Sequence, residues 1–283
     1  MRDKVGVLIE ALPYIIKFKG SVIVIKYGGS AMVKEDLKVS FAKDVVLLKH
    51  LGMHPVIVHG GGKRISELME KLGKKPEFVE GHRITDSETV EIVEMVLSGV
   101  VNKEIVANII KNGGKAVGIS GKDNFTIKAK KKLYKGIDIG FVGQVEKINN
   151  ELIVSLIEDG YIPVISPLGV DDDGNSYNIN ADDVVAEIAV SLKAEKLIYL
   201  TDVDGIYRDI NDKNSLISSI TITELQSLID SGVATGGMVP KLTSIIKAIE
   251  RGVSKVHIIN GTVPHSLLIE LFTDEGIGTQ VTL

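Results

Sequence analysis

The sequence predicts an α/β protein, a three-layer α/β/α sandwich around a mainly parallel sheet. Two observations lead to this prediction: short β-branched runs recur along the chain, and longer segments of helical periodicity lie between them. The short runs are almost continuous in Val, Ile and Leu, which is typical of parallel strands covered on both faces. Alternation of strands and helices over the whole chain favours helices on both sides of one sheet.

The strands are expected at 22–25, 56–58, 116–119, 162–165, 197–200 and 256–259. Apolar residues recur every three or four positions in the expected helices, which span 37–51, 87–111, 181–192 and 241–251. Between 123 and 150 the pattern changes to strict alternation, which predicts a hairpin lying over the sheet. The lysines of this hairpin indicate a solvated face rather than a nucleic-acid surface, since no aromatic platform accompanies them.

Residues 2–19 read as an amphipathic helix that precedes the first strand. We therefore expect three parts: an N-terminal helix (1–20), a first lobe (21–175) and a second lobe (176–283). No linker composition marks the boundary, so the break near 175 would be a hinge within the fold.

The composition excludes several classes of protein. The net charge of −4 gives no general attraction to nucleic acid or to an anionic membrane. The absence of cysteine excludes a disulfide framework, a cysteine nucleophile and thiolate metal sites. No apolar run is long enough to span a membrane and no signal peptide is evident, so we expect a cytoplasmic protein.

Two glycine loops follow the first two predicted strands. Residues 26–30 (Lys-Tyr-Gly-Gly-Ser) contain paired glycines, whose backbone N–H groups can approach an anion, although a plain Gly-Gly turn has the same sequence. Residues 59–63 (His-Gly-Gly-Gly-Lys) open a helix, where backbone N–H groups bind carboxylate or phosphate. This second loop is not a P-loop, because that pattern requires glycine where Ile57 stands.

Three further polar segments lie beside predicted helices and strands. Residues 177–182 precede a helix, and their asparagines are also ordinary N-cap residues. Residues 201–205 end a strand in a turn that either holds a nucleotide or reverses the chain, and residues 235–241 lead into another helix. At the carboxyl edge of a parallel sheet, such loops make a site rich in N–H groups and positive charge, which suits a phosphate compound.

No base–nucleophile pair is evident, and this favours phosphoryl transfer, which depends on positioning and charge neutralisation. A carboxylate acceptor is already ionised at neutral pH and needs cations rather than a general base. Lys26 and Lys241 are the candidate cations, with Asp182 orienting them.

Together these segments resemble the amino-acid kinase family, and within it the members that phosphorylate N-acetyl-L-glutamate. The matching segments appear in the family's order along essentially the whole chain: 26–30, 59–62, 81–86, 177–182, 200–205 and 236–241. Lys63 departs from the proline usual after the glycines, which adds a charge near the substrate loop.

The resemblance implies roles for individual residues. Lys26, Lys241 and Asp182 would be catalytic, with Asp182 organising the two lysines. The substrate would be bound in the first lobe by Gly61, Gly62, Arg83 and Asn178. ATP would be bound mainly in the second lobe, with contacts from Gly28, Gly29, Thr201, Asp202, Gly205, Gly237 and Met238. Mg²⁺ would arrive with the nucleotide, so no protein metal site is expected.

A regulatory subtype is also implied. Arginine-inhibited members of the family have a comparable N-terminal helix, which interlaces dimers into a ring-shaped hexamer, and a C-terminal segment like 270–279. By this resemblance, Tyr14, His257, Glu270 and Gly276 are candidates for an L-arginine site. A PII-type regulatory protein is a further possible partner of such enzymes.

Two alternatives remain open at this point. One is a different acceptor on the same scaffold, such as glutamate, aspartate, carbamate, uridylate or a carrier-bound aminoadipate. The other is a non-catalytic sensor of nucleotide or arginine, which the presence of Lys26, Asp182 and Lys241 disfavours.

Overall fold

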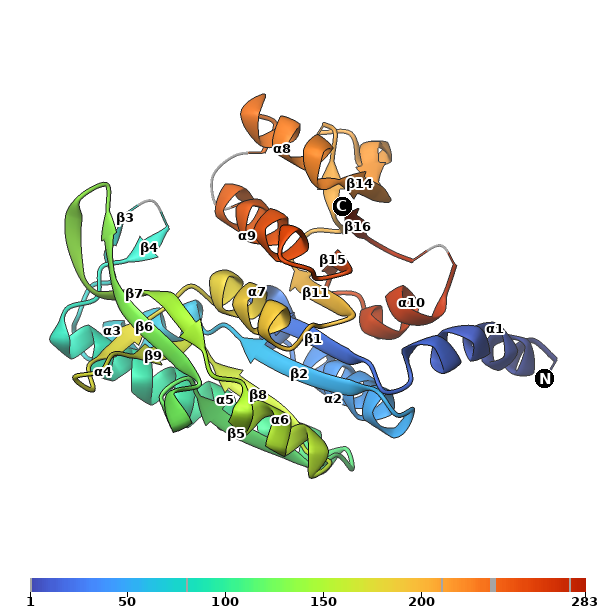
Figure 1. The fold of residues 1–283 in the computed structure, drawn as a ribbon, viewed down its shortest axis with the longest axis horizontal. Coiled ribbons are helices and arrows are strands. Elements are labelled where there is room, and N and C mark those ends of the chain that lie inside the picture. The colour runs from blue at the N-terminus through green and yellow to red at the C-terminus, as the bar shows by residue number, and fades with distance from the viewer. Residues whose placement is uncertain (1, 80, 210, 235–237, 275) are drawn as a thin grey trace.

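The computed structural model describes residues 2–79, 81–209, 211–234, 238–274 and 276–283. Within these ranges an eight-stranded sheet has the order β14-β16-β15-β11-β1-β2-β8-β5 (Figure 1). All neighbouring strands are parallel except β15 and β16. The strands are β1 (Val22–Tyr27), β2 (His54–His59), β5 (Ala116–Ser120), β8 (Ile162–Ser166), β11 (Lys196–Thr201), β14 (Ser219–Thr221), β15 (Lys255–Asn260) and β16 (Thr279–Thr282).

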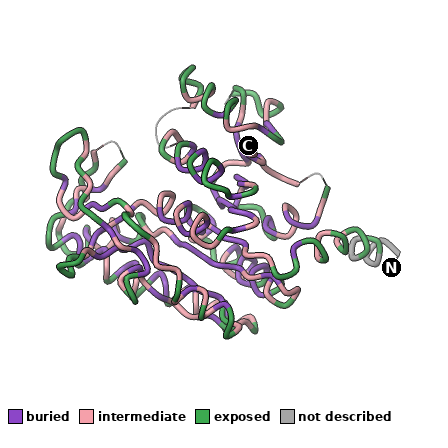
Figure 2. The backbone as a smooth tube through the Cα atoms, viewed as in Figure 1, coloured by how far each residue is buried: buried purple, intermediate pink, exposed green. Residues whose placement is uncertain are grey.

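Helices cover both faces of this sheet, which confirms the predicted three-layer α/β/α fold. One apolar core lies between the sheet and α2 (Glu35–His50), α3 (Gly62–Lys71), α4 (Ser87–Glu94), α5 (Asn102–Lys111) and α10 (Ser266–Phe272). The other lies between the sheet and α6 (Glu151–Glu158), α7 (Ala181–Ser191), α8 (Ile222–Asp230) and α9 (Met238–Glu250). The central strands are buried along most of their length (Figure 2), as their continuous Val and Ile runs predicted.

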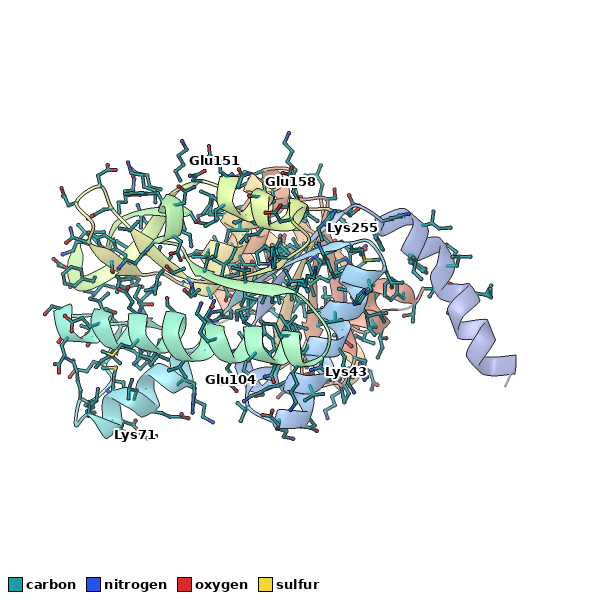
Figure 3. All side chains as sticks on the ribbon, turned by 90° about the horizontal axis from the view of Figure 1, so that it is seen from below. Lys43, Lys71, Glu104, Glu151, Glu158 and Lys255 are labelled. Carbon is teal, nitrogen blue, oxygen red and sulfur yellow. The ribbon has the colours of Figure 1, made fainter. Side chains whose placement is uncertain are left out.

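The helix expected over 87–111 is continuous but not uniform. A seven-residue π-helical segment, η2 (Met95–Val101), separates α4 from α5. Figure 3 shows the whole as one long helix that carries Glu104. π-Helical segments inside α-helices are rare and are frequent at functional sites, and the sequence pattern did not predict this one.

Smaller β-structures accompany the central sheet. The expected hairpin is confirmed as β6 (Ile127–Tyr134) and β7 (Ile137–Ile148), which close a four-stranded barrel with β9 (Leu168–Val170) and β10 (Ser176–Asn178). A second hairpin pairs β3 (Phe78–Val79) with β4 (His82–Arg83), and a third pairs β12 (Ile206–Tyr207) with β13 (Leu216–Ile217). Short 3₁₀ turns occupy η1 (Gly29–Met32), η3 (Asp123–Phe125) and η4 (Lys213–Ser215).

The N-terminal helix is present as α1 (Arg2–Phe18), and it projects beyond the body of the molecule (Figures 1 and 3). Ile9 and Ile16 on it are 64% and 68% exposed. Among the described helices, none combines the length and the apolar character needed to cross a membrane. The central sheet joins the two expected lobes, because β1 pairs with both β2 and β11. The lobe boundary near 175 therefore stays a prediction.

Candidate active site

The loops singled out from the sequence meet at one edge of the sheet. The chain runs from β1 to β2 on one side and later places β11 on the other side of β1, so the strand order reverses beside β1. In open α/β sheets, ligands bind outside the carboxyl ends of the strands at such a reversal. The loops after β1, β2 and β11, at 28–30, 60–62 and 202–205, all start from this point.

Two lysines and one aspartate gather there from three separate elements. Lys26 near the end of β1 lies 3.3 Å, Nζ to Oδ1, from Asp182 in the first turn of α7. Lys241 in the first turn of α9 lies 3.6 Å, Nζ to Oδ2, from the same carboxylate. Each of the three side chains is only 14% exposed. Oδ1 has an ammonium within ion-pair distance but no well-directed hydrogen bond, so attraction between charges holds the pair.

The surroundings of Lys241 disfavour the protonated, charged form of its side chain. Burial lowers its pKa, the Asp182 carboxylate opposes that shift, and the nearby Lys26 ammonium adds to it. Its ammonium also lies 5.7 Å from the centre of the buried Tyr199 ring. One carboxylate thus holds two ammonium groups in a poorly solvated site. The net positive charge of this trio suits a multiply charged anion.

The first glycine loop, which contains Gly28 and Gly29, lies close to the charged groups of Lys26 and Asp202. A Cβ on Gly28 would lie 3.0 Å from the Lys26 ammonium. Gly29 has a φ of +65°, and a Cβ there would lie 2.5 Å from a carboxylate oxygen of Asp202. The same carboxylate accepts a 2.6 Å hydrogen bond from the N–H of Ser30. Glycine is therefore required at 29 on both conformational and steric grounds, and Asp202 ties the loop after β1 to the loop after β11.

The second glycine loop begins α3. Gly61 is the N-cap, no side chain caps this helix end, and a Cβ on Gly61 would lie 2.5 Å from Cδ2 of Leu97. The first N–H groups of a helix have no partner within the helix, so this end can bind an anion. Arg83 of β4 is buried, and its Nη2 donates to the Gly62 carbonyl at 2.8 Å and to Ser66 Oγ at 2.9 Å. A guanidinium therefore lies beside the glycine loop, and burial lowers its pKa.

The two asparagines of the 177–182 segment, Asn178 and Asn180, have different structural roles. Asn180 caps α7 by accepting the N–H of Asp182 at 2.9 Å, as its N-cap sequence predicted. Asn178 does not cap this helix. Its Nδ2 donates at 3.3 Å to Thr85 Oγ1, and Thr85 in turn donates to the carbonyl of Arg83. The hydrogen bonds thus connect Asn178 of β10 to the strand that carries Arg83.

Apart from Gly28 and Gly29 after β1, the described residues predicted to bind the nucleotide lie on the β11 side, in β11, the loop after it and the start of α9. Thr201 Oγ1 donates to the Val203 carbonyl at 2.8 Å and shapes the turn after β11. A Cβ on Gly205 would overlap Oγ1 of Thr279, which leaves room for nothing larger than glycine. Met238 is the first residue of α9. Gly237 lies outside the described residues. Within the described part of the chain, no group of three acidic or histidine side chains could hold a metal ion.

A cavity of about 440 Å³ adjoins the site on the α2 and α5 side. Both glycine loops contribute to its wall, through Gly29 and Gly61, and Tyr27 lines it as well. Lys63, the residue that departs from the family pattern, is exposed at this cavity. The Lys38–Glu104 ion pair connects α2 to α5 across it.

The four residues predicted for arginine also gather, at the junction of α1, β15 and α10. Glu270 lies 2.5 Å from Nδ1 of the buried His257 and accepts the N–H of Ile277 at 2.9 Å. Gly276 has a φ of +61°, and a Cβ there would lie 2.9 Å from Glu270 Oε2. The Tyr14 hydroxyl donates to the Asp274 carboxylate.

Sequence reasoning missed Lys196 at this junction. Its buried ammonium lies 2.8 Å from His257 Nε2 and 5.1 Å from the centre of the Phe18 ring. Burial lowers the pKa of Lys196 to about 8. A lysine that opens a buried strand is the only signal that could have marked it in the sequence.

Comparison with known proteins identifies the family of this chain. Residues 21–260 match the model of the amino acid kinase family. This chain belongs to that family. An acetylglutamate kinase from Methanocaldococcus jannaschii is 54% identical to it, over 100% of this chain and 97% of the relative.

Two solved structures of a longer protein have the same fold over this chain. Both are N-acetylglutamate synthase from Neisseria gonorrhoeae. One, in complex with coenzyme A and N-acetyl-glutamate, has a TM-score of 0.88 and 30% identity, covering 99% of this chain and 63% of that one. The other, in complex with coenzyme A and L-arginine, has a TM-score of 0.84 and 28% identity, covering 98% of this chain and 65% of that one. The chain therefore spans somewhat less than two thirds of that protein.

Proposed function

We propose that this enzyme transfers the γ-phosphoryl group of ATP to the side-chain carboxylate of N-acetyl-L-glutamate, a step of arginine biosynthesis. The observation that carries the proposal is the cluster of Lys26, Asp182 and Lys241 at the reversal of the sheet. Full-length similarity to acetylglutamate kinases supports the choice of acceptor.

The acceptor is positioned from the first half of the chain. The N–H groups of Gly61 and Gly62 bind one of its carboxylates at the start of α3, where the helix dipole favours negative charge. Arg83 pairs with its α-carboxylate, a planar group that matches the guanidinium fork. Asn178 donates to the acetylated end. No general base is required, because the attacking carboxylate is ionised at neutral pH.

The nucleotide is held from the other side. The loop after β11, from Thr201 to Gly205, and the start of α9 bind ATP, and the backbone at Gly28 and Gly29 contacts its phosphates. Mg²⁺, carried by the nucleotide, neutralises charge on the β- and γ-phosphates. The ammonium groups of Lys26 and Lys241 stabilise the negative charge that develops on the phosphoryl group during transfer, and Asp182 fixes the distance between the two lysines.

Regulation by L-arginine is part of the proposal. The gathering of Tyr14, His257, Glu270 and Gly276 supports a site for a cationic amino acid, because the carboxylate of Glu270, whose side chain is only 7% exposed, lies there beside His257. The exposed apolar face of α1 is suited to pairing with another copy of the chain, as in a hexamer made of three dimers. A cytoplasmic location and a PII-type partner remain predictions.

The first experiment measures ADP release by the purified protein with ATP, Mg²⁺ and N-acetyl-L-glutamate, beside L-glutamate and L-aspartate. Hydroxylamine traps the acyl phosphate product. We expect product with N-acetylglutamate alone. Product only with another acceptor would refute the substrate, and no product with any acceptor would favour a sensor.

A further inference from the structure

His59, the last residue of β2, is a fully buried imidazole next to the second glycine loop. Its Nδ1 lies 2.8 Å from the carbonyl oxygen of Gly60, and its Nε2 lies 3.3 Å from Nδ2 of Asn102. A carbonyl oxygen only accepts and an amide nitrogen only donates, so the ring carries its proton on Nδ1. Burial lowers the pKa of His59 to about 4, which leaves the ring neutral at physiological pH.

The orientation of the Asn102 side chain is fixed independently. Its Nδ2 donates one hydrogen to the Val164 carbonyl at 2.9 Å and shares the other between His59 Nε2 and the Ile119 carbonyl, each at 3.3 Å. Its Oδ1 accepts from the Lys103 ammonium at 3.2 Å. A Cβ on Gly118 of the neighbouring strand β5 would overlap Oδ1, so the sheet leaves space for this amide. Asn102 is the first residue after the π-helical segment η2, and it is fully buried.

These contacts set the orientation of one peptide in the glycine loop. His59 holds the carbonyl of Gly60, and the Gly60 N–H donates to the Tyr27 carbonyl at 2.8 Å. Because a trans peptide is planar, its N–H points opposite to its C=O. The Gly61 N–H therefore points away from the imidazole. On the other side, Leu97 of η2 lies too close to Gly61 for any side chain there.

We propose that His59 and Asn102 are positioning residues for the acceptor: through the Gly60 carbonyl they orient the Gly61 amide that binds it. The inference rests on the proposed function, in which the Gly61 and Gly62 amides bind the acceptor. His59 touches no reacting atom and transfers no proton. Its charge stays constant over the working range of pH.

The test compares His59→Leu, which removes both hydrogen bonds, with His59→Gln, whose amide can both donate to Gly60 and accept from Asn102. We expect His59→Leu to raise KM for N-acetylglutamate about tenfold, the loss of roughly one hydrogen bond, with KM for ATP unchanged. His59→Gln should recover most of that loss. The matched control is His54→Leu at the opposite end of the same strand, which should leave both KM values unchanged.

A second measurement needs no variant. Nitrogen chemical shifts of the wild-type imidazole should show His59 protonated on Nδ1 alone across about pH 6 to 8. Protonation on Nε2, or equal changes in both KM values for His59→Leu, would overturn the inference. If the wild type phosphorylates a different acceptor, the proposed function is refuted. The KM values of His59→Leu and His59→Gln for that acceptor then test whether His59 positions it.

Discussion

Replacement of Asp182 by asparagine tests the central feature of the site. The carboxylate lies 3.3 and 3.6 Å from two ammonium groups. With an effective dielectric constant near 20, each attraction is about 5 kcal/mol before desolvation is subtracted. Asparagine has nearly the same shape but no charge, so the two lysines would repel each other and separate. Loss of such preorganised charge lowers kcat by roughly 100- to 1,000-fold.

The variant should also change the dependence of rate on pH. Burial already lowers the pKa of Lys241, and Asp182 is the neighbour that opposes this shift most strongly. Without the carboxylate the pKa falls further, so Lys241 loses its proton at lower pH. The alkaline decline of kcat in Asp182→Asn should therefore begin at lower pH than in the wild type. Initial rates at saturating ATP and acceptor, from about pH 6 to about pH 10, measure both effects.

The matched control is Asp183→Asn, the next residue on the same helix turn. Asp183 accepts a 2.6 Å hydrogen bond from Ser244 Oγ, which the amide oxygen of asparagine can also accept, so the replacement removes one carboxylate from the same turn but keeps the contact to α9 and removes no contact to Lys26 or Lys241. We expect kcat within severalfold of the wild type. A kcat for Asp182→Asn within threefold of the wild type, or equal losses in the two variants, would refute the reasoning.

Three further outcomes are expected. Arg83→Lys should raise KM for the acceptor by about tenfold or more with little change in KM for ATP, since an ammonium cannot reproduce the paired contacts of the guanidinium; equal changes in both would contradict the assignment. Glu270→Gln should abolish inhibition in an L-arginine titration while kcat stays unchanged, and retained inhibition would remove Glu270 from that site. His265→Ala leaves the buried Asp44 carboxylate without its 2.6 Å partner and should cost about 1–3 kcal/mol in urea unfolding at neutral pH. Burial raises the pKa of Asp44 to about 6 although His265 opposes that shift, so without His265 the pKa is higher still and the carboxylate protonates at higher pH. The cost should therefore shrink as the pH falls from neutral toward about 6; a cost that does not change with pH would exclude Asp44 as its cause.

Six strands of the sheet were predictable because most of them are buried on both faces and are therefore almost continuous in Val, Ile and Leu. β14 and β16 have no such run and were not predicted. β1, β2 and β11 extend the predicted runs by two or three residues each. The glycine loops were predictable for a related reason: only glycine fits where Gly29 meets Asp202 and where Gly61 meets Leu97. Burial on both faces selects apolar residues along a strand, and a close contact selects glycine at one position. Both kinds of constraint can therefore be recognised in the sequence.

The parts that escaped prediction depend on contacts between residues far apart in the chain. Nothing in the sequence around Asn102 indicates that its amide, at the start of α5, would contact His59 at the end of β2. Lys196 looks like an ordinary charge at the start of a strand, yet it is buried against His257. The π-helical segment reads as plain helix in the sequence because Val96 and Val100 have α-helical spacing, whereas the structure buries Val101 and leaves Val100 44% exposed.

Two adjacent aspartates explain how one helix start can organise the whole site. Asn180 caps α7 and fixes its first turn, where Asp182 and Asp183 point to different partners. Asp183 binds Ser244 of α9 and so fixes the helix that carries Lys241, while Asp182 binds Lys241 itself and Lys26 of β1. The separation of the two cations therefore depends on a single helical turn that contacts both sides of the strand reversal. In the proposed mechanism phosphoryl transfer relies on charge placement rather than on a base, so we expect the geometry of that turn to control the rate more directly than any proton-transferring group.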